Sequence, residues 1–398
     1  MSSSEYKPIF NRRYLYWLMW FVAIAIVLLS ATGREKPQPL DQIVFQANPP
    51  HYLLPLTTDR VLVRIPIPTS PALSETALAQ QNALVDALGQ RILQKDLQDW
   101  LQKQSSDFYL ERFQTHLVIN LVFQNIPETQ SLSAFWALLT QPPETDWQQL
   151  QMRALAQARL TLQGAESKLL SAAANWLSTQ PSTSAIAPEL YQQVLADSQG
   201  RYHLSGNFQG KRTSDAFVSK QLSTSERPTA ANLTLEGYQS EFFHLKAWPL
   251  RPAHQVEDWV MGRLAALYLQ EWINSQSGEF RLLWQPSESV GYLMIYQSAS
   301  NADALTNFAR VDINTIMPLV TPSLETAKAN LAATLEQQTS SELGMLAWLD
   351  LMTRFNWPPD AYQTALSSLQ QADINTLHNW MLDNLSNDHL LNLSLRPY

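Results

Sequence analysis

The segment of residues 14–32 constrains this chain most, because it contains no charged side chain. An α-helix rises 1.5 Å per residue, so about 19 residues just cross a hydrocarbon core of about 30 Å. Three basic residues, Lys7, Arg12 and Arg13, precede the segment, and aromatic residues crowd its first half. A positive flank followed by an aromatic belt is typical of a membrane anchor whose C-terminal side is translocated.

We therefore predict a cytoplasmic leader over residues 1–13 and a transmembrane anchor over residues 14–32. The side chains expected to contact the membrane are Trp17, Trp20, Phe21 and Leu28. The anchor places the chain in the inner (cytoplasmic) membrane with a single pass, and its soluble region faces the periplasm or the exterior. A cleavable signal peptide is the alternative, since Ala31-Thr32-Gly33 offers small residues to a signal peptidase. The apolar run exceeds the usual length of a signal-peptide core, which favours the anchor.

The region after the anchor is acidic and lacks cysteine. The whole chain carries a net charge of −8, and residues 1–36 hold five basic and two acidic side chains, which leaves −11 for the rest. A region of that charge repels polyanions, so nucleic acid is not expected as a partner. The absence of cysteine excludes disulfides, thiolate zinc sites and cysteine nucleophiles.

Proline-rich and polar stretches mark the expected boundaries of the soluble region. Residues 33–50 are rich in proline and are predicted to form a linker. Two later stretches, residues 180–200 and 211–231, are polar and contain turn-forming residues, so we place a division near residue 200. The predicted domains are residues 51–200 and residues 201–398.

The first predicted domain begins with strand and helix patterns in a definite order. Apolar residues alternate over residues 60–67 and again over residues 117–123, which predicts two strands with one buried face each. Between them, Leu78, Val85, Leu88 and Ile92 recur at the spacing of one helical face. Helical patterns then run from residue 132 to about residue 176.

The second predicted domain repeats this order of strands and helices. Strands are expected at residues 202–208, 232–237, 241–250, 280–284, 291–297 and 391–395. Helices are expected at residues 256–273, 302–316, 324–335, 342–355, 362–369 and 374–385. The repetition predicts an α+β fold of two similar halves, each a mostly antiparallel sheet with helices on one face.

The C-terminal residues resemble a known family. Residues 356–397 contain a proline turn at Pro358, a short helix with Tyr362, the acidic helix start Ala372-Asp373-Ile374 and a closing strand. This segment resembles the end of insulinase-like, or pitrilysin-type, zinc peptidase units. Residues 324–335 look like the preceding helix of that family, and Gly206-Asn207-Phe208 looks like the opening of its second half. An unrelated α+β protein with similar periodicities is the alternative.

The resemblance implies a zinc site that this sequence does not keep. The family binds zinc through an inverted His-x-x-Glu-His on a helix and a later glutamate, because two imidazoles at i and i+4 share one helical face. The matching positions here are Asn82, Val85 and Asp86, with Gln157 near the third ligand. Amides are poor donors to zinc and valine transfers no proton, so no metal and no cofactor is expected.

The function implied by the resemblance is that of a non-catalytic subunit. In the family, one unit holds two similar halves, and two units close around a peptide. We expect this chain to pair with a zinc-bearing insulinase-like homologue as a membrane-anchored partner in a heterodimeric peptidase chamber, where it could also contact peptide. One alternative is a stand-alone envelope scaffold or binding protein that retains only the fold. Another is a zinc metallopeptidase with an unrecognised metal site.

Overall fold

The computed structural model describes residues 39–178, 187–198, 201–208, 214–217, 226–276, 278–303, 305, 308 and 321–398. Residues from Pro39 to Tyr398 form one compact unit. The predicted leader, the predicted transmembrane segment and the beginning of the predicted linker lie outside the described residues. Within the described ranges, no helix combines the length and the apolar character needed to cross a membrane.

The first sheet contains six strands in the order β1-β2-β6-β3-β5-β4. Their bounds are β1 (Val44–Ala47), β2 (Pro50–Pro55), β3 (Val61–Pro68), β4 (Asp107–Arg112), β5 (His116–Phe123) and β6 (Tyr202–Gly206). Strands β2 and β6 run parallel, whereas the other neighbouring pairs are antiparallel.

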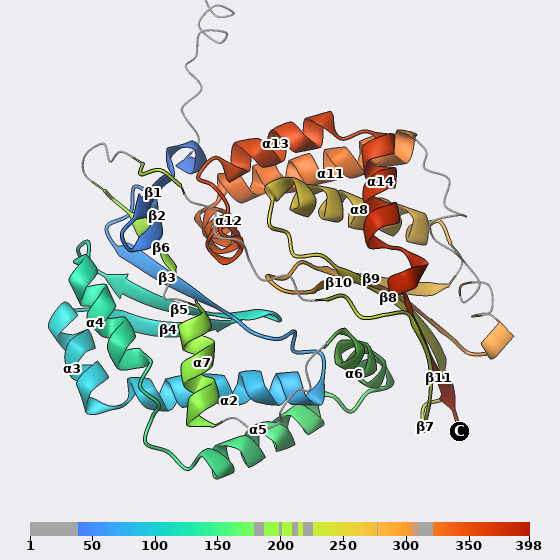
Figure 1. Ribbon diagram of the computed structural model, residues 1–398, viewed down its shortest axis with the longest axis horizontal. Coiled ribbons are helices and arrows are strands. Elements are labelled where there is room, and N and C mark those ends of the chain that lie inside the picture. Colours follow the sequence, from blue (N-terminus) through green and yellow to red (C-terminus); the bar gives the residue numbers. More distant parts are fainter. Residues whose placement is uncertain are drawn as a thin grey trace, which may run out of the picture. The chain divides into compact units, whose positions relative to one another are not determined.

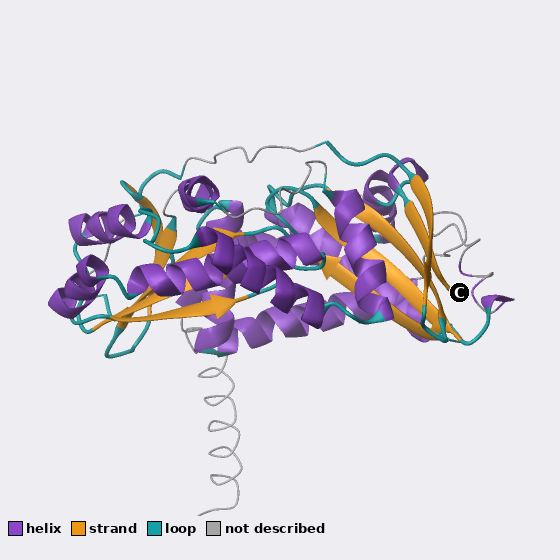
Figure 2. Cartoon of the chain, turned by 90° about the horizontal axis from the view of Figure 1, so that it is seen from below, coloured by secondary structure: helices purple, strands orange, loops and turns teal. Residues whose placement is uncertain are grey.

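The second sheet contains five strands in the order β7-β11-β8-β10-β9. Their bounds are β7 (Ala231–Gly237), β8 (Phe242–Leu250), β9 (Glu279–Gln285), β10 (Gly291–Ala299) and β11 (Leu391–Pro397). Strands β7 and β11 run parallel, and the other neighbouring pairs are antiparallel. Figure 2 shows the strands gathered in two groups with helices between and beside them.

The two sheets are copies of one topology. If β1 is set aside, β2, β6, β3, β5 and β4 correspond in order and direction to β7, β11, β8, β10 and β9. A long helix follows the matching strands in both copies, α2 (Glu75–Ile92) after β3 and α8 (Val256–Asn274) after β8. The mixed α+β architecture with two similar halves, which the repeated pattern predicts, is therefore present.

The remaining helices follow the same division. In the first half they are α3 (Lys95–Gln104), α4 (Thr129–Leu139), α5 (Trp147–Thr161), α6 (Ala165–Leu177) and α7 (Pro188–Ser198). In the second half they are α11 (Thr321–Ser340), α12 (Glu342–Phe355), α13 (Ala361–Gln371) and α14 (Ile374–Asn384). Two 3₁₀ turns, η1 (Pro39–Gln42) and η2 (Asn387–His389), complete the described elements.

Side chains that the sequence places at the helix ends explain several of these boundaries. The Ser74 hydroxyl accepts a hydrogen bond from the Ala77 backbone and starts α2, while Asp146 caps α5 in the same way. Asp373 and Thr376 form a capping box that starts α14. Asn356 adopts a left-handed conformation with φ 53° and ends α12.

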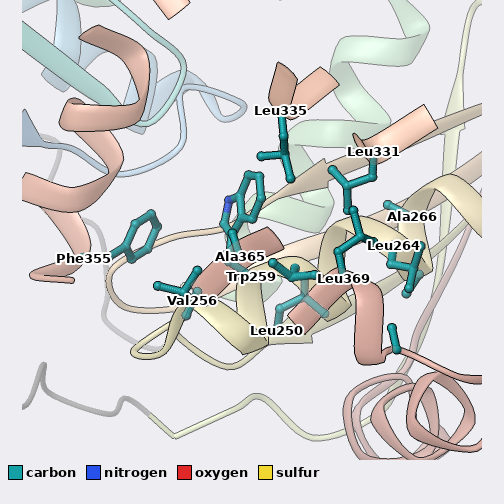
Figure 3. Close-up of a cluster of buried hydrophobic side chains, with 14 of the residues drawn as sticks. Leu250, Val256, Trp259, Leu264, Ala266, Leu331, Leu335, Phe355, Ala365 and Leu369 are labelled. Atoms are coloured by element: carbon teal, nitrogen blue, oxygen red, sulfur yellow. The ribbon is translucent and has the colours of Figure 1, made fainter. Parts of the chain in front are cut away.

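The main hydrophobic core lies between the second sheet and its helices. Figure 3 shows Trp259 of α8 among side chains from β8, α11, α12 and α13. The labelled members of this core are Leu250, Val256, Trp259, Leu264, Ala266, Leu331, Leu335, Phe355, Ala365 and Leu369. A separate core packs α2 against β3 and β5 of the first sheet.

Each sheet is covered on its second face by a helix from the other half. Helix α6 contacts β8 and β11, and its Leu169, Ala173 and Leu177 pack among apolar side chains of the second sheet. Helix α12 contacts β2, β3 and β6 of the first sheet. Figure 1 shows α6 on the side of the second sheet opposite to α8, α11 and α14. The prediction that helices cover one face of each sheet is therefore incomplete, because it counted only the helices of the same half.

Two predicted boundaries also differ from the structure. The strand expected at residues 202–208 was assigned to the second half, but β6 pairs with β2 and β3 of the first sheet, so the first half extends through Gly206. The predicted linker of residues 33–50 contains η1 and β1 and reaches the start of β2. Its prolines suggested a spacer, yet Pro39 starts η1 and Pro50 is the first residue of a strand, where proline is tolerated.

The strand and helix predictions are otherwise confirmed at most positions. The predicted strands in both halves and the helices at 256–273, 324–335, 342–355, 362–369 and 374–385 all coincide with observed elements. The helix expected at residues 302–316 lies mostly outside the described residues. The sequence patterns do not indicate strands β1, β2 and β4 or helices α3 and α7, and α7 lies within the polar stretch of residues 180–200 that marks the expected boundary.

The packing of α6 on the second sheet predicts how a substitution in this helix changes stability. Leu169→Ala on α6 should lower the free energy of unfolding by about 3 kcal/mol, because it removes a fully buried side chain from the face of the second sheet. Leu160→Ala on α5 is the matched control, since that leucine is 71% exposed and its loss should change stability by at most about 0.5 kcal/mol. Urea unfolding followed by circular dichroism measures both. Equal effects of the two substitutions would contradict the packing of α6 on the second sheet.

Candidate functional site

The predicted zinc positions lie on α2, and an arginine of β4 contacts the first of them. Asn82 is buried, Val85 packs partly into the first core and Asp86 is half-buried. Arg112, the last residue of β4, donates from Nη1 to Oδ1 of Asn82 at 2.5 Å. Its Nε donates to Oε1 of Gln81 at 2.7 Å. A fixed cation in contact with the first ligand position repels Zn²⁺, so the residues present do not fit this metal.

The third predicted ligand position is also unsuited to metal binding. Gln157 lies on α5, which packs against α2, but its side chain is exposed. The residues of α5 buried nearby are Ala154 and Ala158, and Ala158 packs with Leu78 and Ala79 of α2. In the part of the chain that the structure describes, no group of three or more histidine, aspartate or glutamate side chains could hold a metal ion.

A second polar site lies on the opposite face of the first sheet, under α12. Arg64 of β3 forms a bidentate ion pair with Asp350 of α12, with Nη2 to Oδ2 at 2.7 Å and Nε to Oδ1 at 3.2 Å. Its Nη2 also donates to Oε2 of Glu111 at 2.9 Å, and its Nη1 donates to Oδ1 of Asn120 at 3.0 Å. Both residues of the ion pair are buried, so these contacts offset the loss of their hydration.

His203 of β6 completes the hydrogen bonding of Asp350. Its Nε2 lies 2.8 Å from Oδ1 of Asp350, and burial lowers the pKa of the imidazole, although Asp350 acts in the opposite direction. The neutral ring therefore donates from Nε2 and leaves Nδ1 without a partner. Burial alone would raise the pKa of Asp350, but His203 and Arg64 bring it down to about 2. Asp350 is thus a fixed anion and not a proton acceptor at neutral pH.

A further ion pair extends this network to the second sheet. Arg354 of α12 pairs with Glu288 in the turn between β9 and β10, with Nη2 to Oε2 at 3.1 Å. The same Nη2 donates to the Thr115 hydroxyl at 3.3 Å, and Gln285 donates to that hydroxyl as well. Burial and the neighbouring Arg354 lower the pKa of His116 to about 3. The network joins the two halves, and its carboxylates are engaged by guanidinium groups, so we assign it a structural role.

Sequence reasoning identified α2 and its missing ligands but not Arg112, Arg64 or Asp350. Apolar and polar residues alternate only weakly in β4, and none of its residues is fully buried. The sequence pattern therefore does not predict that Arg112, its last residue, faces α2. An arginine within the apolar alternation of residues 61–67 was the available signal for a buried charge at Arg64.

Comparisons with known proteins identify the fold. The sequence matches no protein-family model and no curated protein. Among solved structures, an inactive domain of a peptidase M16 from Pseudomonas fluorescens is 14% identical, with a TM-score of 0.63 over 88% of this chain and 95% of that chain. A protease from Helicobacter pylori is 8% identical, with a TM-score of 0.59 over 87% of this chain and 97% of that chain.

A longer protein shares the fold over part of its length. The periplasmic protease PqqL from Escherichia coli is 14% identical, with a TM-score of 0.54, and the match covers 88% of this chain but 44% of PqqL. At these identities the likeness shows the fold. The resemblance to insulinase-like peptidases, which form the M16 family, is therefore confirmed for the architecture of the chain.

The buried histidines predict how stability depends on pH. The pKa of His116 falls from 6.5 to about 3 on folding, so below about pH 6.5 the unfolded chain takes up a proton that the folded chain refuses. His116 therefore does not destabilise the folded chain at neutral pH. Below about pH 6.5 it lowers the free energy of unfolding progressively as the pH falls toward 3. His116→Gln should reduce the slope of unfolding free energy against pH by about 1.4 kcal/mol per pH unit between pH 4 and 6.

Urea titrations at several pH values measure that slope. The matched control is His378→Gln on the exposed side of α14, which should leave the slope as it is. A slope unchanged by His116→Gln would show that His116 is not held neutral by the fold.

The positions on α2 predict weak zinc binding. After dialysis against zinc sulfate and desalting, the purified full-length chain should retain well under one zinc ion per chain, because Asn82 and Gln157 replace an imidazole and a carboxylate donor and Arg112 lies against Asn82. Inductively coupled plasma mass spectrometry measures the metal. One tightly held zinc ion per chain that is lost on Asn82→Ala would overturn this assignment.

Proposed function

We propose that this chain is a non-catalytic M16-type subunit that pairs with a zinc-bearing homologue to form a heterodimeric peptidase chamber. The observation that carries the proposal is an M16 fold whose zinc positions hold Asn82, Val85 and Asp86, with the Arg112 guanidinium against the first of them. A chain of this kind supplies chamber wall and not the metal. The catalytic zinc then comes from the partner.

The match to PqqL supports the idea of pairing. This chain covers 44% of PqqL, whereas it covers 92% of the first half of PqqL when that half stands alone. A protein such as PqqL thus carries more than one such unit in a single polypeptide. In the proposed complex the second unit is a separate chain.

The proposal includes a membrane tether. Residues 14–32, with Trp17, Trp20, Phe21 and Leu28, would anchor the complex in the inner membrane with the folded unit in the periplasm or exterior. Three of the four outer strands of the two sheets, β4, β7 and β9, offer backbone groups to an extended peptide in the chamber.

Affinity purification tests the pairing. An epitope-tagged chain isolated from native membranes in mild detergent should bring down a homologous peptidase with intact His-x-x-Glu-His. Only the mixture should cleave unfolded peptides, and a zinc chelator should stop the cleavage. Mass spectrometry of the eluate and a fluorogenic peptide assay measure both properties.

A variant lacking residues 1–38 serves as the control for the tether. It should leave the membrane fraction and still recover the partner, because Pro39–Tyr398 forms one compact unit. Recovery of the full chain without any metallopeptidase would contradict the pairing and favour the stand-alone scaffold.

A further inference from the structure

Arg112 carries a positive charge that no carboxylate of the described residues neutralises. Successive side chains of a strand point to opposite faces, so Glu111 reaches Arg64 on the α12 face while Arg112 lies against α2. Asp86 lies one helical turn after Asn82 and forms no ion pair with Arg112. The hydrogen bonds of Arg112 go to two neutral amide oxygens.

These two amides hold the guanidinium in one orientation. Gln81 is 2% exposed, and its Nε2 donates to Oγ1 of Thr69 at 3.1 Å and to the Phe113 carbonyl at 2.7 Å. That arrangement fixes Oε1 of Gln81 toward Nε of Arg112, while Asn82, 5% exposed, receives Nη1. Within the described residues, Nη2 of Arg112 donates no hydrogen bond. The guanidinium is therefore oriented by buried groups with one of its donors unused.

The surroundings of Arg112 leave its guanidinium accessible to an anion. The residue is exposed at the end of β4, while partial covering of the guanidinium lowers its pKa, so a negative partner would stabilise the charge. The neighbouring Phe113 is 41% exposed and stacks on His116 at 4.5 Å between ring centroids. His116 is neutral at physiological pH, and Arg354, which reaches Thr115 of the same hairpin, is paired with Glu288. Among the described residues, Arg112 therefore supplies the unpaired positive charge at this end of the β4–β5 hairpin.

We propose that Arg112, held by Gln81 and Asn82, binds a carboxylate of an extended peptide at the place where zinc peptidases of this fold hold their metal. A hydrogen bond from Nη2 of the guanidinium to a charged carboxylate is stronger than one to a neutral amide, which gives the site its preference. The site binds without cleaving, since Val85 cannot act as a base. The proposal concerns this chain alone and does not depend on the partner subunit.

The carboxylate is either the C-terminus of the peptide or a glutamate side chain within it, and one experiment distinguishes the two. The probe is a short fluorescein-labelled peptide of alanine, serine and tyrosine in three forms: a free C-terminus, a C-terminal amide, and a C-terminal amide with one internal glutamate. Fluorescence anisotropy with the full-length chain in detergent gives the dissociation constant of each. At least one of the two carboxylate forms should bind about tenfold or more tightly than the uncharged amide, with a preference that weakens as salt rises. The form that binds identifies the source.

Two variants assign the binding to Arg112. Arg112→Gln should abolish the preference for a carboxylate, while Arg396→Gln, which removes an exposed arginine from β11 of the other sheet, should keep it. Asn82→Asp keeps the oxygen that Arg112 contacts and places a carboxylate there, so it should also abolish the preference while the fold is maintained.

Circular dichroism and urea unfolding of each variant show whether the fold is kept. The proposal is overturned if the three peptides bind alike, if none of them binds, or if the carboxylate preference survives in a folded Arg112→Gln or Asn82→Asp variant.

Discussion

The buried ion pair between Arg64 and Asp350 is the interaction on which the arrangement of the two halves depends. It fixes α12, a helix of the second half, against β3 of the first sheet. Removing two charges from water is costly, and the pair is tolerable only because His203, Asn120 and Glu111 satisfy the remaining donors and acceptors. Loss of one partner would leave an uncompensated charge in the interior. The position of α12 is therefore specified by polar geometry as well as by packing.

The second sheet shows the same architecture with different chemistry. At the matching place, α6 lies on β8 and β11 through Leu169, Ala173 and Leu177. Apolar packing is tolerant of small shifts, whereas a bidentate ion pair is directional. Helix α6 thus contributes apolar burial on the second sheet. Helix α12 contributes a directional ion pair that sets its position on the first sheet. The ion pair of Arg354 and Glu288 links the same helix to the turn between β9 and β10, so α12 contacts the first sheet and a turn of the second half.

The sequence predicted those parts of the fold that follow from local periodicity. Alternating residues at 61–67 and 117–123 and the helical face from Leu78 to Ile92 coincide with β3, β5 and α2. The placement of β6 was wrong because pairing between distant strands leaves no trace in local periodicity, and Gly206 ends a strand of the first sheet. For the candidate site, too, local spacing was informative and contacts between distant residues were not. The substituted zinc positions on one helix were predictable from spacing, but Arg112 reaches Asn82 across about 30 residues through the pairing of β4 with β5.

Because α6 covers the second sheet and α12 covers the first, the chain cannot be cut into two fragments that each keep both faces of their sheet covered. A fragment that ended after β6 would keep its strands but lose the helix that covers Arg64 and His203, and the complementary fragment would expose Leu245, Met294 and Leu393 to water. Neither fragment has a closed surface, so neither is an autonomous folding domain despite the duplicated topology. The two halves are repeats in pattern, yet each sheet needs a helix of the other half to cover it, so residues from Pro39 to Tyr398 form one compact unit.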